Sequence, residues 1–325
     1  MLRIYLDQNK WIDLARARTG HASGKMYIAA YEAAKAAVEA GSASFPLSSA
    51  HYFEAHKQAV AQRRVDLART MLELSRLDAI APPHVIVPYE IEAALIEVLG
   101  LAYEPPQPLK LFGHGANHVH ATDVFTYTAP DEFEGHFLAP DLRNLLTVHG
   151  QAQLEFITLA DCPEFGNTRI QLNKHMRLTV AKFVDGQNTV RDRLEKLGHH
   201  RLGDMMTATA ILDIVEPLLA TAERLEVDLD RLSDGGRKLI NSFVEAMPSR
   251  WVEKELRRLR QSNPQKRWEG NDLNDVTALS IAVPYCDVVI TERSWTAMLN
   301  SQKINARFNT QVLHDLRELP DLLQA

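Results

Sequence analysis

Cysteine and long apolar runs are scarce in this chain of 325 residues, and each scarcity excludes a class of protein. Cys162 and Cys286 are the only cysteines and have no metal-ligand spacing, so neither a disulfide framework nor a thiolate zinc site is expected. No uninterrupted apolar stretch approaches the roughly 20 residues that cross a bilayer. The first residues reach Asp7 before any apolar run typical of a signal peptide. We therefore expect a cytoplasmic protein without a membrane partner.

An excess of positive charge is also missing. The net charge of −6 argues against a protein that coats nucleic acid by bulk attraction, although a local basic groove remains compatible with it. Basic residues do gather over 250–267, close to Trp251 and Trp268, whose indole faces can stack on bases. The segment fits either a substrate groove or a solvated helix face that uses Glu253 and Glu255 as partners. Its basic residues are Arg250, Lys254, Arg257, Arg258, Arg260, Lys266 and Arg267.

Familiar catalytic motifs are absent as well. The chain has no Gly-rich phosphate loop, no nucleophile elbow and no HExxH sequence. His114, His118 and His120 lie in a Gly-containing segment at a spacing that suits a transition metal. A polar loop without an ion is the favoured interpretation, because segments rich in Gly and His need no ligand.

Hydrophobic periodicity predicts an α/β protein in which a parallel sheet, flanked by helices, is built from both ends of the chain. A large, mostly helical insertion is expected between the two sheet halves, which gives boundaries at 1–98, 99–265 and 266–325. The expected strands are 2–6, 44–48, 287–291 and 310–314. The expected helices are 10–17, 26–40, 50–77, 167–197, 203–225, 235–246, 248–260, 272–282, 294–301 and 316–323.

Acidic residues follow or flank the predicted strands. Asp7 ends the first strand, Glu292 follows Thr291, Asp272 and Asp275 open the preceding helix, and Glu54 begins another. Each acid alone is explained as a helix cap or a solvated residue. In one parallel sheet, however, all five would face the carboxyl ends of the strands and repel one another unless a cation joined them. Hard divalent cations take oxygen ligands, so the pattern indicates a metal-dependent hydrolase.

The sequence around these acids resembles that of PIN-domain ribonucleases. The first segment is a strand that ends in Asp7 and is followed by Asn9, and the last is a strand that ends in Thr291-Glu292 and is followed by Trp295. The four similar segments are 5–14, 46–54, 271–279 and 286–292. The resemblance implies that the expected parallel sheet, flanked by helices, is PIN-like.

The resemblance implies that Mg²⁺ or Mn²⁺ is bound by Asp7, Glu54, Asp275 and Glu292, with Asp272 as an additional catalytic acid. It further implies cleavage of RNA with 3′-hydroxyl and 5′-phosphate products. The family usually has Asp where this chain has Glu292, and a shifted register would place Arg293 there instead. Asn9 is expected to orient Asp7. Substrate phosphates are expected to contact Arg293 or the basic residues Arg257, Arg258, Lys266 and Arg267.

The function expected from the sequence is therefore a metal-dependent endoribonuclease. A catalytically inactive nucleic-acid-binding or scaffold protein on the same fold is one alternative, and a structure-specific DNA nuclease is another. RNA is the expected substrate. An inhibitory partner protein or a homo-oligomer is also compatible with the resemblance, since small PIN nucleases are often held in check by a partner.

Overall fold

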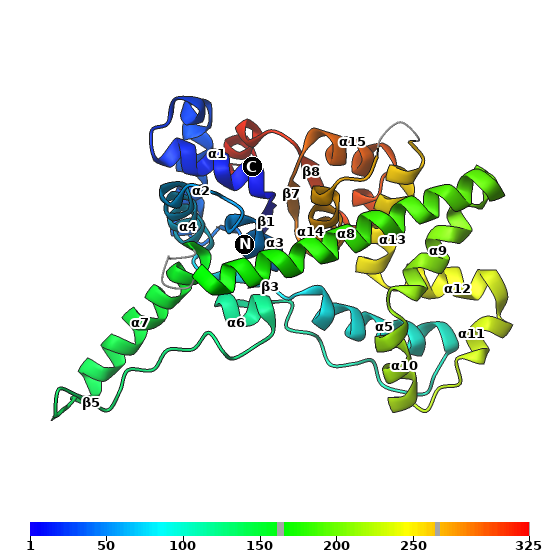
Figure 1. Cartoon of the computed structure of the whole chain (residues 1–325), viewed down its shortest axis with the longest axis horizontal. Coiled ribbons are helices and arrows are strands. Elements are labelled where there is room, and N and C mark those ends of the chain that lie inside the picture. The colour runs from blue at the N-terminus through cyan, green and yellow to red at the C-terminus, as the bar shows by residue number, and fades with distance from the viewer. Residues whose placement is uncertain (161–165, 264–266, 325) are drawn as a thin grey trace. The chain divides into compact units, whose positions relative to one another are not determined.

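The computed structural model describes residues 1–160, 166–263 and 267–324 (Figure 1). The chain has an α/β fold that is mostly helical, with short parallel strands. It divides into two compact units. Unit 1 comprises Met1–Pro82, Phe112–Asn173 and Asp315–Ala325, and unit 2 comprises Pro83–Leu111 and Lys174–His314. Residues 99–265, which the sequence suggests as one insertion, contribute to both units.

Unit 1 contains one parallel strand pair, β1 with β2, in the register Leu2↔Ala43 and Arg3↔Ser44. Its strands are β1 (Leu2–Leu6), β2 (Ala43–Ser44), β3 (Asp78–Ile80), β4 (Phe112–His114), β5 (Glu132–Phe133) and β6 (His136–Phe137). Its helices are α1 (Gln8–Arg18), α2 (Ile28–Glu39), α3 (Ser49–Ala55), α4 (Ala61–Ser75), α6 (Gly115–His120), α7 (Pro140–Ala160) and α16 (Leu319–Gln324), with 3₁₀ turns η1 (Ala22–Tyr27) and η5 (Leu316–Glu318).

The first strand is confirmed as Leu2–Leu6, and it supplies the centre of the core of unit 1. Ile4 and Leu6 are fully buried, as is Trp11 on α1, whose ring meets Phe45 edge-on with centroids 6.4 Å apart. In Figure 1, α7 runs away from α1, α2 and α4 toward the β5–β6 hairpin. Burial of the apolar residues of β1 fixes the register of the strand, and it therefore fixes the position of the acidic residue at the end of the strand.

Two expected elements of unit 1 are wrong in extent. The expected strand 44–48 ends after Ser44, because Pro46 has no N–H to donate to a ladder, and Leu47 forms only an isolated parallel bridge with Ala79. The expected helix 50–77 is broken between α3 and α4. The guanidinium of Arg64 donates to the carbonyl oxygens of Gln58 and Ala59, so this buried side chain satisfies backbone groups in the break.

Unit 2 contains the other parallel pair, β7 with β8, in the register Val289↔Val312. The backbone hydrogen bonds of Asp287 with Gln311 and of Thr291 with Leu313 extend this pairing over the whole expected strand 287–291. Its strands are β7 (Val288–Ile290) and β8 (Gln311–Leu313). Its helices are α5 (Pro83–Leu99), most of α8 (Gly166–Leu197), α9 (Leu202–Leu212), α10 (Val215–Arg224), α11 (Asp230–Asp234), α12 (Gly236–Glu245), α13 (Pro248–Gln261), α14 (Gly270–Tyr285) and α15 (Arg293–Ser301), with 3₁₀ turns η3 (His199–Arg201) and η4 (Asn305–Phe308).

The core of unit 2 joins α5, α10 and α12, and its centre is formed by Ile91, Leu95, Phe243 and Val244, all fully buried. The expected single helix 203–225 is wrong, because α9 and α10 meet at a bend of 61°. Pro217 explains the bend, since proline lacks the N–H and clashes with the carbonyl four residues earlier in a continuous helix. In the described part of the chain no single helix has the length and apolarity to cross a membrane. The bent pair of α9 and α10 has them together, by length and composition alone.

Candidate functional site

Asp7 lies at the junction of β1 and α1 in unit 1. It has extended backbone angles and caps α1, with its Oδ1 accepting the Gln8 N–H at 2.7 Å. Its backbone carbonyl accepts the N–H groups of Lys10 and Trp11, which closes the first turn. Asp7 is half-buried, so the structure gives it the capping role and also the strand-end position that the metal interpretation requires.

His51 connects the end of β1 to the beginning of α3. Its Nε2 donates to the Leu6 carbonyl at 2.7 Å, and its Nδ1 accepts the Ser48 N–H at 2.9 Å. A carbonyl only accepts and an amide N–H only donates, so the two contacts define a neutral imidazole protonated at Nε2. Burial lowers the pKa of His51 to about 4, which keeps the ring neutral. Leu6 directly precedes Asp7, and Glu54 lies one turn after His51, so one imidazole holds both acid-bearing segments.

The other expected residues of unit 1 lie on the same two helices. Glu54, on α3, has a side chain 16% exposed, and one carboxylate oxygen is 3.8 Å from Nζ of Lys57. Asn9 is half-buried in the first turn of α1.

Sequence reasoning did not single out Gln8 or His51. The amide of Gln8 is buried, and its nitrogen and oxygen have no hydrogen-bond partner among the described residues. A buried amide without a hydrogen-bond partner lowers the stability of the fold, so the Gln8 amide indicates that a polar group is required beside Asp7. Only sequence position could have indicated these two residues, because Gln8 directly follows Asp7 and His51 is three residues after the capping Ser48.

In unit 2, Asp275 on α14 is linked to α15. Nε1–H of Trp295 donates to Oδ2 of Asp275 at 2.9 Å, and the Trp295 side chain is buried. Glu292 occupies the N-cap position of α15 with extended backbone angles and is exposed, and Trp295 lies in the first turn that follows it. The indole therefore joins one predicted acid to the helix turn that carries another. Arg293, the alternative at that position, is exposed at the start of the same helix.

Asp272 has partners that favour a structural role. Its Oδ2 accepts from Nη2 of Arg260 at 2.6 Å and from the Glu269 N–H at 2.7 Å. The side chains of Arg260 and Asp272 are 3% and 10% exposed, so this is a buried ion pair that also closes the capping box of α14. The cap interpretation, one of the two offered by the sequence, accounts for these contacts.

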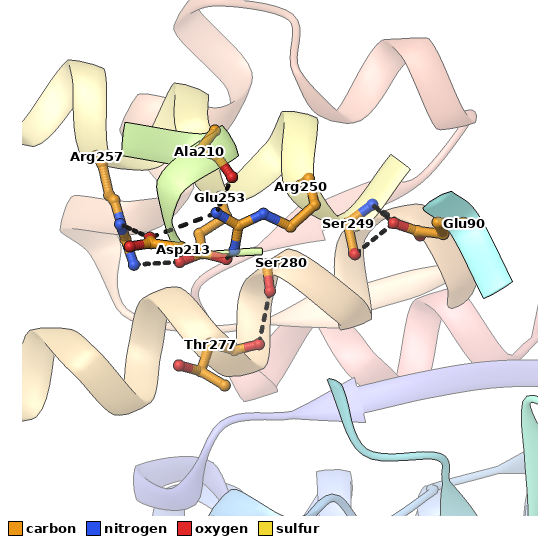
Figure 2. A network of polar contacts seen from close by, with 9 residues as sticks. All are labelled: Glu90, Ala210, Asp213, Ser249, Arg250, Glu253, Arg257, Thr277 and Ser280. Carbon is orange, nitrogen blue, oxygen red and sulfur yellow. Dashed lines mark hydrogen bonds and ion pairs between the residues drawn. The ribbon is translucent and has the colours of Figure 1, made fainter. Parts of the chain in front are cut away.

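Several basic residues of α13 are buried, and Figure 2 shows two of them, Arg250 and Arg257, in a network of polar contacts. Arg257 is buried and pairs with Asp213 at 2.5 Å and with Glu253. Arg250 is also buried, and it contacts Asp213, Glu253 and the Ala210 carbonyl. Burial by itself lowers the pKa of Arg257, but the charges of Glu253 and Asp213 outweigh burial and raise it. Burial and these two ion pairs favour a structural role for Arg257, so it is not among the phosphate contacts proposed below.

The remaining basic residues differ in accessibility. Nε of Arg258 donates to Glu255 at 2.7 Å, with the arginine side chain 32% exposed, and Arg267 is exposed. Lys266 lies outside the described residues. Trp268 is 4% exposed and meets Phe183 edge-on, so its indole is covered by the protein and is not available to stack on bases. The guanidinium of Arg307 lies over the ring of Trp251, 4.3 Å from the ring centroid.

A buried carboxylate fixes the beginning of α13 beside this network. Glu90 accepts the Ser249 N–H at 2.9 Å and the Ser249 hydroxyl at 2.6 Å, as Figure 2 shows, and also the Tyr285 hydroxyl. Burial raises the pKa of Glu90, against the lowering effect of these donors. These contacts connect α5, α13 and α14, and they leave Glu90 in a structural position.

No group of three or more His, Cys, Asp or Glu side chains placed to hold one metal ion occurs among residues 1–160, 166–263 and 267–324. The carboxylates have the oxygen chemistry that Mg²⁺ prefers. Of the three histidines considered above, His120 packs against Tyr52, Phe53 and Phe125, with ring centroids 5.2 to 5.8 Å away.

Comparison with protein-family models, with curated proteins and with solved structures finds no match to this chain.

Proposed function

We propose that this chain is a metal-dependent endoribonuclease that hydrolyses RNA phosphodiester bonds. Asp7, Glu54, Asp275 and Glu292 are the proposed ligands of Mg²⁺ or Mn²⁺. The proposal rests first on the order of the four segments that resemble PIN-domain ribonucleases. The α/β fold supports it, because one parallel strand ends at Asp7 and another is followed by Thr291 and Glu292.

The observation that carries the proposal is the bond from Trp295 to Asp275 in unit 2. The indole N–H can only donate, and here it donates to one oxygen of the Asp275 carboxylate. This bond holds that oxygen in place and gives the carboxylate a defined orientation. The same indole belongs to the turn that begins at Glu292. Fixing a carboxylate through a neighbouring donor is how proteins prepare groups that bind metals.

A bound divalent ion would supply an activated water and would neutralise charge that develops on the phosphate. The residues of the chain hold the acids in position. His51 holds the two backbone segments that carry Asp7 and Glu54, and Asn9 is proposed to orient Asp7. The buried amide of Gln8 offers a hydrogen-bonding group beside Asp7. Arg293, Arg267 and Arg258 are the proposed phosphate contacts, because each has exposed surface.

The test is Mn²⁺-dependent cleavage of a panel of RNAs and single-stranded DNAs by the full chain. We expect cleavage of RNA by the wild type, and loss of at least about 100-fold in rate for Asp7→Asn and Asp275→Asn, the order observed when one essential charge-stabilising group is removed. Asp321→Asn in unit 1 and Asp192→Asn in unit 2 are matched controls, because both remove an exposed carboxylate. Circular dichroism establishes that each variant is folded.

The outcomes separate the three functions. Cleavage of DNA but not RNA by the same acids would replace the proposal with a DNA nuclease. RNA binding of equal strength with and without Mn²⁺, with no cleavage, would identify an inactive binding protein. Cleavage that survives Asp7→Asn and Asp275→Asn would show that the activity arises elsewhere, and it would overturn the assignment of these residues.

A further inference from the structure

A cavity of about 680 Å³ opens in unit 2 among α9, α10, α11 and α12. Three of its lining residues, Leu218, Leu232 and Phe243, belong to the hydrophobic core and are at most 7% exposed. Leu212, another lining residue, is 69% exposed. The volume lies within the range of about 300–1,000 Å³ typical of small-molecule pockets. None of the proposed metal ligands lines it, so this cavity is independent of the proposed nuclease function.

The wall of the cavity offers little unsatisfied polarity. Eight of the thirteen lining residues are apolar. Two of the polar ones bind each other, because the Thr207 hydroxyl donates to Oδ1 of Asn241 at 3.0 Å. A ligand that fills the interior therefore gains by burying apolar surface, and it finds few groups with which to exchange hydrogen bonds.

Charge is concentrated at Asp204 and Arg237, the two charged residues among those that line the cavity. Nη2 of Arg237 lies 2.5 Å from Asp204, and Nη1 of Arg201 lies 3.6 Å from the same carboxylate. The arginine side chains are 73% and 58% exposed. One carboxylate facing two guanidinium groups leaves an excess of positive charge. A guanidinium has five N–H donors, so its pairing with Asp204 leaves donors for a second anion.

We propose that this cavity binds an amphipathic anion, namely a medium-chain fatty carboxylate. The alkyl chain occupies the apolar interior formed by residues such as Ile211, Ile240 and Phe243. The carboxylate head pairs with Arg237, supported by Arg201. Charge complementarity selects this ligand: a neutral chain of the same length would lose the ion pair, and a cationic one would be repelled by the excess positive charge.

The experiment measures binding of decanoate, decanol and decylammonium to the full chain by calorimetry. Decanoate should bind most tightly and decylammonium most weakly. Affinity should rise about fourfold for each added methylene from octanoate to decanoate, the fold-change that corresponds to about 0.8 kcal/mol per buried CH₂. Equal binding of all three head groups would overturn the role of the arginines.

Two variants locate the site. Arg237→Gln should weaken decanoate binding about tenfold, which corresponds to about 1.4 kcal/mol, and leave decanol unchanged. Arg193→Gln, an exposed arginine on α8, is the matched control and should change neither. Ala208→Trp adds bulk to a lining residue that is exposed, so the fold should tolerate it while all three ligands are excluded. No binding by the wild type, or binding that Ala208→Trp leaves intact, would overturn the proposal.

Discussion

Replacement of Glu253 by glutamine tests the buried charge network of unit 2 most directly. Glu253 is within ion-pair distance of both Arg250 and Arg257, and the side chains of these three residues are 7% to 14% exposed. Glu253→Gln leaves two buried guanidinium groups with only Asp213, whose side chain is 37% exposed, as their carboxylate partner in the network. Removing one partner of a buried pair costs about 3–5 kcal/mol. Because the glutamine oxygen still accepts a hydrogen bond, we expect about 3 kcal/mol.

The assay is urea unfolding followed by tryptophan fluorescence. Three of the four tryptophans, Trp251, Trp268 and Trp295, belong to unit 2, so the signal reports mainly on that unit. With a slope of about 2 kcal/mol per molar urea, a loss of about 3 kcal/mol lowers the midpoint by about 1.5 M.

Glu92→Gln is the matched control in the same unit. Its partner Arg224 is 56% exposed, and exposed pairs contribute about 1 kcal/mol or less. The midpoint should therefore fall by less than about 0.5 M. If Glu253→Gln shifts the midpoint no further than Glu92→Gln, with the slope unchanged, the argument that buried charges hold α13 in place is refuted.

Three further predictions concern residues around the proposed metal ligands. The folded-state pKa of His51 is lowered from 6.5 to about 4, so the neutral ring contributes about 3 kcal/mol of stability above pH 6.5, and this contribution is lost as the pH falls toward 4. His51→Gln should therefore flatten the dependence of the free energy of unfolding on pH between 6.5 and 4. An unchanged slope in that window would contradict the argument that burial lowers the pKa. Trp295→Phe removes the donor to Asp275 while retaining an aromatic ring, and it should reduce Mn²⁺ affinity or cleavage by about 10–100-fold, whereas Trp251→Phe should change neither. Gln8→Met removes a buried unsatisfied amide and should raise the free energy of unfolding by about 1 kcal/mol in urea; a loss of that size would show that the amide is satisfied.

Local sequence determined much of the secondary structure. The strand Leu2–Leu6, the pairing over 287–291, and the helices α8, α12 and α13 agree with the expected ranges to within one or two residues. Their signals are contiguous: alternating apolar residues, Gly and Pro at helix ends, and helical periodicity. The capping role of Asp272 belongs to this class too, because a helix cap depends on residues three positions apart.

Tertiary structure alone decided which charges are buried. Asp213 precedes its partner Arg257 by 44 residues, and no local pattern distinguishes an arginine in an ion-pair network from one on a solvated face. The break between α3 and α4 has the same kind of cause. Arg64 is held there by the carbonyl oxygen of Ala160, 96 residues later, as well as by the carbonyls of the break itself.

The proposed site divides in the same way. The sequence determined which acids follow strands and open helices, because strand ends and caps are local features. Only the fold brought His51 to the carbonyl of Leu6 and the Trp295 indole to Asp275, contacts that span 45 and 20 residues. The physical reason is that a side chain's burial, its pKa and its hydrogen-bond partners depend on which distant segments pack around it, and packing is a property of the folded chain as a whole.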